Sequence, residues 1–236
     1  MTIDLRGQRV LVVGAAGGIG KAAAEAFAVA GAQVTAAGRT QETVDVVARS
    51  IGGEAAQLDV RDNAQVEALF ADRPAFDHVV VTAASTITGP VAHLSLDDAK
   101  ASMESKFWGA YQIARAAKVN SGGSITFVSG VLSQRPSATS VLQGSINASL
   151  EALSRGLALE RAPIRVNTVS PGLIDTPLHD RMPTDARETL YQRMRTILPA
   201  RRVGQAQDVA QAIVFVAANA FVTGSTINVD GGALIA

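Results

Sequence analysis

Short runs of β-branched and apolar residues alternate along the chain with longer, alanine-rich segments whose apolar positions follow a helical period. The runs that predict strands are residues 9–13, 33–37, 54–58, 78–81, 124–128, 165–169 and 226–229. Between residues 142 and 157, leucine and isoleucine recur every three or four positions, which predicts one long amphipathic helix. This order of strands and helices predicts an α/β fold with a doubly wound, mostly parallel sheet in three αβα layers.

One segment breaks this alternation. Residues 175–198 are polar and arginine-rich and contain Pro177 and Pro183. Ligands of doubly wound sheets bind at the carboxyl ends of the strands, so we predict that this segment covers that edge as a substrate lid. No repeat, low-complexity tract or linker interrupts the remainder, and residues 1–236 are therefore predicted to form a single domain.

The composition excludes several classes of function. The chain has 236 residues, of which 47% are hydrophobic, and its 21 Lys and Arg balance its 21 Asp and Glu. Zero net charge argues against a nucleic acid or an anionic membrane as the main partner, so we expect neither. The absence of cysteine excludes thiolate catalysis, and the three histidines lack the spacing of metal ligands, so no metal site is expected.

The first residues of the sequence do not have the pattern typical of a signal peptide. Residues 1–6 do not begin with basic residues followed by an apolar stretch, so the sequence predicts no signal peptide. The longest apolar runs, such as residues 212–218, are too short to span a bilayer. A cytoplasmic location is therefore expected.

A glycine-rich turn, residues 14–20 (Gly-Ala-Ala-Gly-Gly-Ile-Gly), follows the first predicted strand directly and opens a helix predicted over about residues 19–30. Glycine permits the tight turn and lets the backbone approach a pyrophosphate, to which the helix N-terminus presents its N–H groups and positive dipole. Because the turn lies between a strand and a helix, it predicts a dinucleotide-binding site rather than an ordinary surface turn.

The end of the second predicted strand distinguishes NAD from NADP. An acidic side chain there accepts hydrogen bonds from the ribose hydroxyls, whereas an arginine pairs with a 2′-phosphate. The strand runs into Arg39 and Thr40, and the first carboxylate after it is Glu42. We therefore predict NADP(H) as the cofactor, with Arg39 as the phosphate clamp and Thr40 in support. The alternative is that Arg39 is a solvated surface residue with no role in distinguishing the two cofactors.

Four motifs carry a family resemblance. They are Gly14-x-x-x-Gly18-x-Gly20, Leu58-Asp59-Val60, Arg165-Val166-Asn167-x-Val169-x-Pro171-Gly172-x-Ile174-x-Thr176, and Thr223-Gly224-x-Thr226-Ile227-Asn228-Val229-Asp230-Gly231-Gly232. In their order and spacing over essentially the whole chain, they resemble the short-chain dehydrogenase/reductase family. The resemblance implies a Rossmann-type fold, an oxidoreductase acting on a small carbonyl or alcohol substrate, and a homodimer or homotetramer.

The resemblance also implies cofactor contacts. Asp59 would bond the adenine amino group, and Thr176 would reach the phosphates or the amide. Pro171-Gly172 and Ile174 would place the nicotinamide amide. The alternatives are a helix N-cap for Asp59 and an ordinary turn at Pro171. The cofactor-binding residues expected in total are Gly14, Ala16, Gly18, Ile19, Gly20, Arg39, Thr40, Asp59, Val60, Ala83, Pro171, Gly172, Ile174 and Thr176.

The catalytic motif of that family is absent. Its members place a Tyr-x-x-x-Lys pair on one face of the long helix, where the tyrosine donates a proton to the developing alkoxide. Here Arg115 follows Tyr111 by four residues, and Arg195 follows Tyr191 by four. No lysine occurs after Lys118, so the chain contains no Tyr-x-x-x-Lys sequence.

Alignment of the long helix with the family pattern places other residues at the catalytic positions. Gln143 stands in the place of the tyrosine, Asn147 in that of the lysine, Gly130 in that of the serine, and Lys106 in that of the asparagine. Lys106 is a candidate acid or base, because a desolvated lysine has a lowered pKa. Gln143, Asn147 and the neighbouring hydroxyl of Ser129 complete the candidate catalytic set.

Three interpretations of this site remain open. The first is an active NADP(H)-dependent oxidoreductase with a rebuilt site. The second is a catalytically silent NADP(H)-binding sensor or partner subunit, because loss of general acid catalysis alone removes about 10²- to 10⁴-fold in rate. The third is a non-redox isomerase or lyase. The alternative for Lys106 is a surface lysine paired with Glu104, and for Gln143 and Asn147 it is structural hydrogen bonding.

Overall fold

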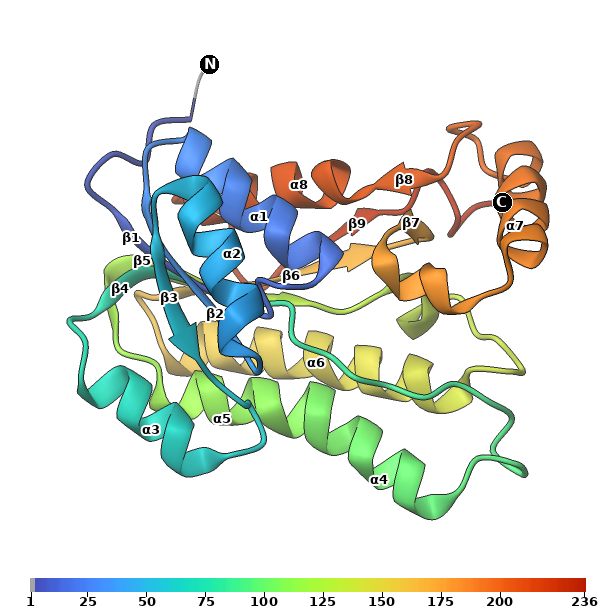
Figure 1. Cartoon of the computed structure of the whole chain (residues 1–236), viewed down its shortest axis with the longest axis horizontal. Helices are drawn as coiled ribbons and strands as arrows, with labels where there is room; N and C mark the ends of the chain where they lie inside the picture. The colour runs from blue at the N-terminus through green and yellow to red at the C-terminus, as the bar shows by residue number, and fades with distance from the viewer. Residues whose placement is uncertain (1–2) are drawn as a thin grey trace.

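The computed structural model describes residues 3–236, in which seven parallel strands form one sheet between two layers of helices (Figure 1). The strands are β1 (Arg9–Val13), β2 (Gln33–Gly38), β3 (Glu54–Gln57), β4 (Phe76–Val81), β5 (Val119–Val128), β6 (Arg165–Pro171) and β9 (Thr226–Val229). Their order is β3-β2-β1-β4-β5-β6-β9, and each neighbouring pair is parallel. The predicted doubly wound α/β fold in three layers is confirmed. Met1 and Thr2, at the start of the segment considered for a signal peptide, lie outside the described residues.

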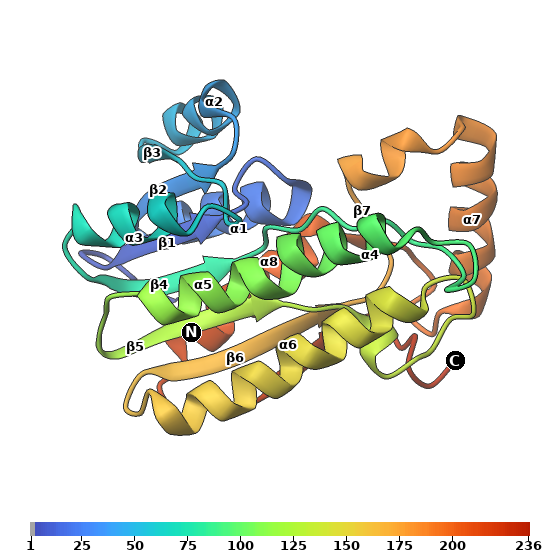
Figure 2. The ribbon, with the colours of Figure 1, turned by 90° about the horizontal axis from the view of Figure 1, so that it is seen from below.

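Alternate strand residues build two cores, one on each face of the sheet. Val10 and Val12 face one core, whereas Leu11 and Val13 face the other, as the two-residue period of a strand requires. The first face is covered by α1 (Gly18–Val29), α2 (Gln41–Ile51) and α8 (Ala206–Ala218), and the second by α3 (Asn63–Ala71), α5 (Gly109–Ala116) and α6 (Val141–Glu160). Figure 2 shows α5 and α6 running along the second face.

The strand beginnings depart from the prediction in two places. β5 starts at Val119, five residues before the predicted residue 124, and β4 starts at Phe76 rather than at residue 78. Phe76 pairs with Val119, and the register then shifts before His78 pairs with Ser124. The intervening residues 120–123 are polar or glycine, so no hydrophobic pattern marks this part of the strand.

The segment predicted as an excursion does leave the sheet. It comprises β7 (Ile174–Asp175), the short helix η3 (Pro177–Arg181) and α7 (Thr184–Ile197), and it projects beyond the carboxyl ends of the strands (Figure 1). β7 pairs with β8 (Gly204–Gln205) in a separate ladder, and the buried Tyr191 donates from its hydroxyl to Asp175 Oδ1 at 2.9 Å. This bond attaches α7 to the start of the excursion. Its function as a lid stays a prediction.

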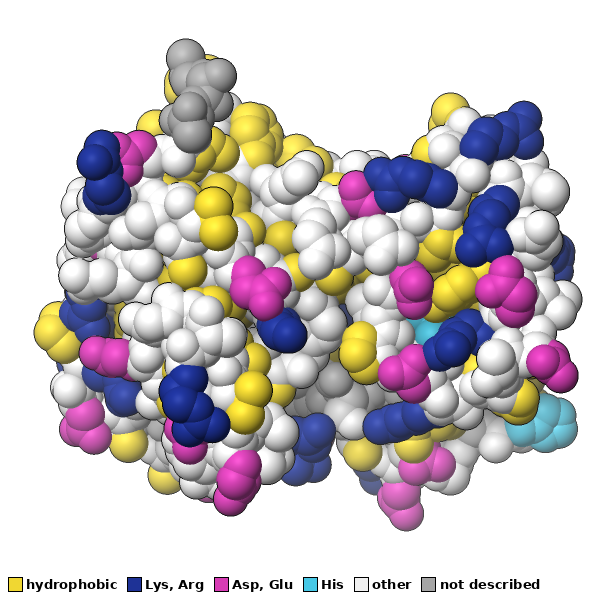
Figure 3. Space-filling model, turned by 45° about the horizontal axis from the view of Figure 1, so that its top comes forward, with side chains coloured by type: hydrophobic (Ala, Val, Ile, Leu, Met, Phe, Trp, Pro, Cys, Tyr) yellow, Lys and Arg dark blue, Asp and Glu magenta, His cyan; other side chains and the backbone are white. Residues whose placement is uncertain are grey.

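One face of the molecule carries mixed charge. On the face shown in Figure 3, basic and acidic side chains are interspersed and no large patch of one sign forms. Within residues 3–236, no helix combines the length and the apolar character needed to cross a bilayer.

A buried arginine ties β6 to the end of α8. Arg165 is only 7% exposed, and its guanidinium donates to the carbonyl oxygens of Val216, Ala217 and Val222. Carbonyl groups in the last turn of a helix have no partner within the helix and carry the negative end of its dipole. Arg165 therefore caps α8 and fastens it to the start of β6.

Replacing Arg165 by methionine should destabilise the fold by about 1–3 kcal/mol, because it leaves buried carbonyl groups without donors. Urea unfolding would measure this loss. The control is Arg155→Met, since Arg155 lies on the exposed face of α6. Equal unfolding midpoints for the two variants would contradict the capping role.

Candidate functional site

The turn between β1 and α1 has a shape that only glycine allows. Gly14 has φ +89°, and a Cβ there would lie 2.6 Å from the Ala83 nitrogen. A Cβ at Gly20 would lie 2.1 Å from the Gly14 oxygen. No side chain caps α1 at Gly17, so its first N–H groups are open to an anion. This turn fits a dinucleotide pyrophosphate.

A cleft of about 290 Å³ lies against this turn, at the carboxyl ends of β1 to β4. It gathers seven of the predicted cofactor-binding residues: Gly14, Ala16, Arg39, Thr40, Asp59, Val60 and Ala83. Thr43 and Arg61 also line it, although they were not predicted. The only signal for Arg61 in the sequence was its position two residues after Asp59.

The other predicted cofactor residues lie outside that cleft. Ile19 packs against the first core, so its side chain faces the sheet. Gly18 meets Thr176, because a Cβ at Gly18 would lie 2.8 Å from the Thr176 Cβ. A Cβ at Gly172 would lie 2.8 Å from the Asp230 Cα, so glycine is needed there for close packing. Pro171 ends β6, and Ile174 starts β7.

Asp59 is held by Arg61 in the cleft. Arg61 Nη2 donates to Asp59 Oδ2 at 2.6 Å, and Arg61 Nε donates to Oδ1 at 3.0 Å. The Arg61 guanidinium holds the pKa of Asp59 below its ordinary value. The alternative of a helix N-cap is wrong for Asp59, because Asp62 caps α3 and accepts from the Ala64 and Gln65 N–H groups.

Arg39 and Thr40 occupy the end of β2 as predicted. Both are exposed, and within the described part of the chain Arg39 forms no ion pair. Thr40 is the N-cap residue of α2, but its hydroxyl makes no capping bond. A guanidinium and a hydroxyl are therefore available together beside the cleft, as binding of a phosphate group requires.

Lys106 is buried rather than exposed. It lies in a π-helical turn, η1 (Glu104–Trp108), between α4 (Leu96–Met103) and α5. Its Nζ donates to the Ser129 carbonyl oxygen at 2.8 Å and to Asn147 Oδ1 at 2.6 Å. The alternative of a surface lysine paired with Glu104 is wrong, because Glu104 is exposed and Lys106 is only 7% exposed. Single π-helical turns within α-helices frequently mark functional sites.

Asn147 joins the residues around Lys106. Its Oδ1 also accepts from Gln143 Nε2 at 3.3 Å, and its Nδ2 donates to the Gly130 carbonyl at 3.1 Å. Gly130 has φ +155°, and a Cβ there would lie 2.8 Å from Asn147 Nδ2. Gly130 and Asn147 therefore fit each other, because a larger residue at position 130 would displace the amide.

Two features differ from the expected catalytic set. The Ser129 hydroxyl is not spare, because it donates to Glu151 Oε1 at 2.9 Å, and Ser129 contributes its carbonyl oxygen to Lys106 instead. Gln143 keeps a buried Oε1 that has no hydrogen-bond partner within residues 3–236. This oxygen is an acceptor available to a ligand hydroxyl.

Lys106 Nζ has two hydrogen-bond partners within residues 3–236. Burial lowers the pKa of Lys106 to about 8, and the charge of Glu151 opposes that fall. A neutral amine has two N–H donors and one lone pair, whereas an ammonium has three donors. Both states can donate to Ser129 and Asn147, so a change in the protonation of Lys106 breaks neither bond.

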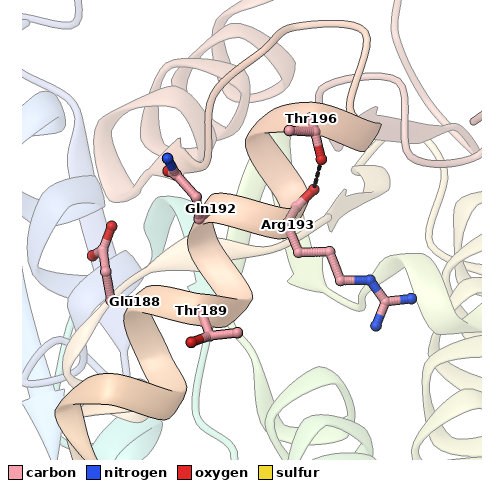
Figure 4. Close-up of a pocket in the computed structure, with 5 residues that line it drawn as sticks. All are labelled: Glu188, Thr189, Gln192, Arg193 and Thr196. Atoms are coloured by element: carbon pink, nitrogen blue, oxygen red, sulfur yellow. Dashed lines mark hydrogen bonds between the residues drawn. The ribbon is translucent and has the colours of Figure 1, made fainter.

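A second hollow, of about 510 Å³, lies along α7 (Figure 4). Its lining residues are Glu188, Thr189, Gln192, Arg193 and Thr196, all from the exposed side of that one helix. No second element adds a lining group, so polar groups do not converge there as they do in a binding site. Within residues 3–236, no three His, Asp or Glu side chains form a cluster that could hold a metal ion.

The parallel sheet and the glycine turn define the class of doubly wound dinucleotide-binding folds. The family model described as "Enoyl-(Acyl carrier protein) reductase" matches residues 14–233. The chain is 32% identical over 253 residues to "Short-chain dehydrogenase/reductase ATR9" of Stachybotrys chlorohalonatus (strain IBT 40285), covering 98% of both chains. It is also 32% identical to "D-erythrulose reductase" of Gallus gallus, covering 99% of this chain and 98% of that one.

A solved structure, "Crystal structure of a small-chain dehydrogenase in complex with NADPH", superposes with a TM-score of 0.86 at 36% identity. The alignment covers 97% of this chain and 99% of that chain. The chain belongs to the short-chain dehydrogenase/reductase family, as its motifs indicated.

Gly130→Ala should destabilise the protein by about 1–3 kcal/mol, because the new methyl group overlaps the Asn147 amide. Thermal unfolding would measure the loss. Gly122→Ala is the control, since Gly122 also has a positive φ but an open surround. The double variant Gly130→Ala/Asn147→Ala should recover part of the stability. Equal losses at positions 122 and 130 would show that the amide imposes no constraint.

Proposed function

We propose that this protein is an NADP(H)-dependent oxidoreductase of small carbonyl or alcohol substrates, in which Lys106 takes over the proton transfer of the absent tyrosine. The observation that carries the proposal is the buried Lys106 amine, which donates to two oxygen acceptors near the carboxyl ends of the strands. The similarity to D-erythrulose reductase supports a small carbonyl substrate.

The cleft supports a phosphorylated dinucleotide. The glycine turn and the uncapped start of α1 suit a pyrophosphate, and Asp59 is an ionised acceptor for the adenine amino group. Arg39 and Thr40 suit a 2′-phosphate, in the absence of an acidic side chain at the end of β2. The NADPH complex of a 36% identical dehydrogenase supports the same choice. When bound, NADPH supplies the hydride.

Lys106 donates the proton that this reaction needs. As the carbonyl carbon gains a hydride, its oxygen becomes an alkoxide and takes a proton from the Lys106 ammonium. The lysine is left as a neutral amine that keeps its bonds to Ser129 and Asn147. In alcohol oxidation the same amine accepts the proton. A pKa of about 8 suits both directions near neutral pH.

Asn147 and Gln143 position the reacting groups. Asn147 Oδ1 fixes the Lys106 amine, and Gln143 Nε2 donates to the same oxygen. With its amide thus oriented, Gln143 offers its unpartnered Oε1 to a hydroxyl of the substrate or of the nicotinamide ribose. The residues that replace the family's Tyr and Lys therefore act as supports for an amine that comes from the preceding helix.

Arg39→Ala should weaken NADPH binding about 10- to 100-fold and leave NADH binding nearly unchanged, because one charge-assisted contact to a phosphate contributes about 1.5–3 kcal/mol. Titration of Trp108 fluorescence measures both affinities. Arg49→Ala is the control, since Arg49 is exposed on α2 and does not line the cleft. Equal affinity of the wild type for NADPH and NADH would refute the cofactor assignment.

Lys106→Met should reduce turnover about 10²- to 10⁴-fold while leaving NADPH affinity within a few-fold of wild type, because it removes the proton donor. The rate of carbonyl reduction in the wild type should fall as pH rises through about 8, as the ammonium loses its proton. A panel of small ketones and aldehydes provides the assay.

Lys100→Met is the matched control, because Lys100 is exposed on α4. Turnover by Lys106→Met at the wild-type rate would exclude the proposed acid. Tight NADPH binding with no turnover of any panel member would instead favour the sensor or partner-subunit alternative. The oligomeric state, a homodimer or homotetramer, remains a prediction that analytical ultracentrifugation tests. The cytoplasmic location also remains a prediction.

A further inference from the structure

Glu151 is a buried carboxylate for which the proposed reaction has no use. It lies on α6, is 6% exposed, and is the one buried carboxylate within residues 3–236. Lys106 is the one buried lysine in the same part of the chain. Isolated charges are costly to bury, so a buried carboxylate near a buried amine calls for a physical explanation.

One residue, Ser129, connects these two groups. Its carbonyl oxygen accepts from Lys106 Nζ at 2.8 Å, and its hydroxyl donates to Glu151 Oε1 at 2.9 Å. The Ser133 hydroxyl donates to the same carboxylate oxygen at 2.6 Å. No direct ion pair forms between Lys106 and Glu151, so their charges act on each other across Ser129.

The long helix places Glu151 in line with the other candidate residues. Gln143, Asn147 and Glu151 follow one another at intervals of four, so they lie on one face of α6. Asn147 contacts Lys106 directly, and Glu151 sits one turn further from the start of the helix. The same face that holds the amine therefore also carries its nearest buried negative charge.

We propose that Glu151 is a positioning residue for Lys106, which balances the charge of the amine through Ser129 and touches neither substrate nor cofactor. Its catalytic consequence rests on the proposed function of Lys106. The interaction between the charges of Glu151 and Lys106 does not depend on that function, and it can be measured without turnover.

The other charged groups near Lys106 are exposed or engaged elsewhere, so Glu151 is the counter-charge to consider. Glu104, on the same π-helical turn as Lys106, is exposed, and so is Arg155 on α6. Arg135, beyond the short helix η2 (Val131–Ser133), donates to the Ala233 carbonyl oxygen and is engaged there. Burial alone pushes the pKa of Lys106 down, and Glu151 is the charge that acts against it.

A purely structural role would make a different prediction. If Glu151 only tied Ser129 and Ser133 to α6, its removal would loosen the loop without a directed change in the proton affinity of Lys106. If Glu151 is a counter-charge, removal of its negative charge should lower the proton affinity of Lys106. Removal of a hydrogen-bond donor to its carboxylate should raise that affinity, because the negative charge is then less neutralised. Two substitutions with opposite expected signs separate these roles.

The experiment is a pH titration of the lysine side chains by NMR on protein labelled with ¹³C-lysine. The chain has only four lysines, Lys21, Lys100, Lys106 and Lys118, so at most four side-chain signals need assignment. Lys106→Arg assigns the signal of Lys106 by its loss. The other three lysines serve as internal controls and should not shift in any variant.

Glu151→Gln should weaken the proton affinity of Lys106 about tenfold, because it removes a buried negative charge and keeps the shape of the side chain. Ser133→Ala should strengthen that affinity a few-fold, because the carboxylate loses one donor. Unchanged Lys106 titration in both variants would overturn the proposal. If Glu151→Gln does not fold, Ser133→Ala decides alone: a rise supports the proposal and no change overturns it.

The outcome also distinguishes this proposal from the proposed function. A Lys106 titration that responds to Glu151, in a protein that turns over no substrate, supports the counter-charge and contradicts the oxidoreductase. Turnover that requires Lys106, with a Lys106 titration indifferent to Glu151, supports the oxidoreductase and contradicts the counter-charge.

Discussion

The burial of the central sheet on both faces constrains where this molecule can place polar chemistry. All seven strands run in one direction, and helices cover both faces, so each strand alternates between two apolar cores. The backbone and side-chain groups at the carboxyl ends of the strands are the ones left open to a ligand. Gly14, Arg39, Asp59 and Ala83 are far apart in the sequence, yet each follows a strand and therefore lines the same cleft.

The same edge makes the burial of Lys106 possible. An amine taken out of water needs acceptors, and Ser129 and Asn147 supply two oxygens at hydrogen-bond distance. Asn147 in turn needs the space that Gly130 leaves, and Ser129 connects the amine to Glu151. These residues contact one another as one set around the buried amine.

Tyr191 has a structural role, unlike the proton-donating tyrosine of the family's catalytic motif. Burial and the bond to Asp175 raise its pKa to about 12, which makes it a poor proton donor at neutral pH. Its position fastens α7 close to Thr176, whose side chain packs against Gly18 in the nucleotide turn. One of the two tyrosines of the chain is therefore a structural attachment between the excursion and the cofactor region.

The order of strands and helices, the nucleotide turn and the exposed Arg39 could be predicted from sequence, because local hydrophobic periods and glycine spacing determine them. The start of β5 could not, since polar residues pair there only because β4 lies alongside. The sequence offered a helix N-cap as the alternative role of Asp59, and only the backbone path shows that Asp62 caps α3 instead. Glu151 gave no signal, because a glutamate on an amphipathic helix usually faces water.

The amino-acid sequence by itself determined the doubly wound fold, the nucleotide turn and the absence of a Tyr-x-x-x-Lys pair, since each depends on residues close together in the chain. Only the tertiary structure decided that Lys106 is buried, that Asn147 and Ser129 hold it, and that Ser129 connects it to the buried Glu151. The physical reason is that burial and pKa depend on groups brought together from separate helices and strands, and no local pattern records those neighbours.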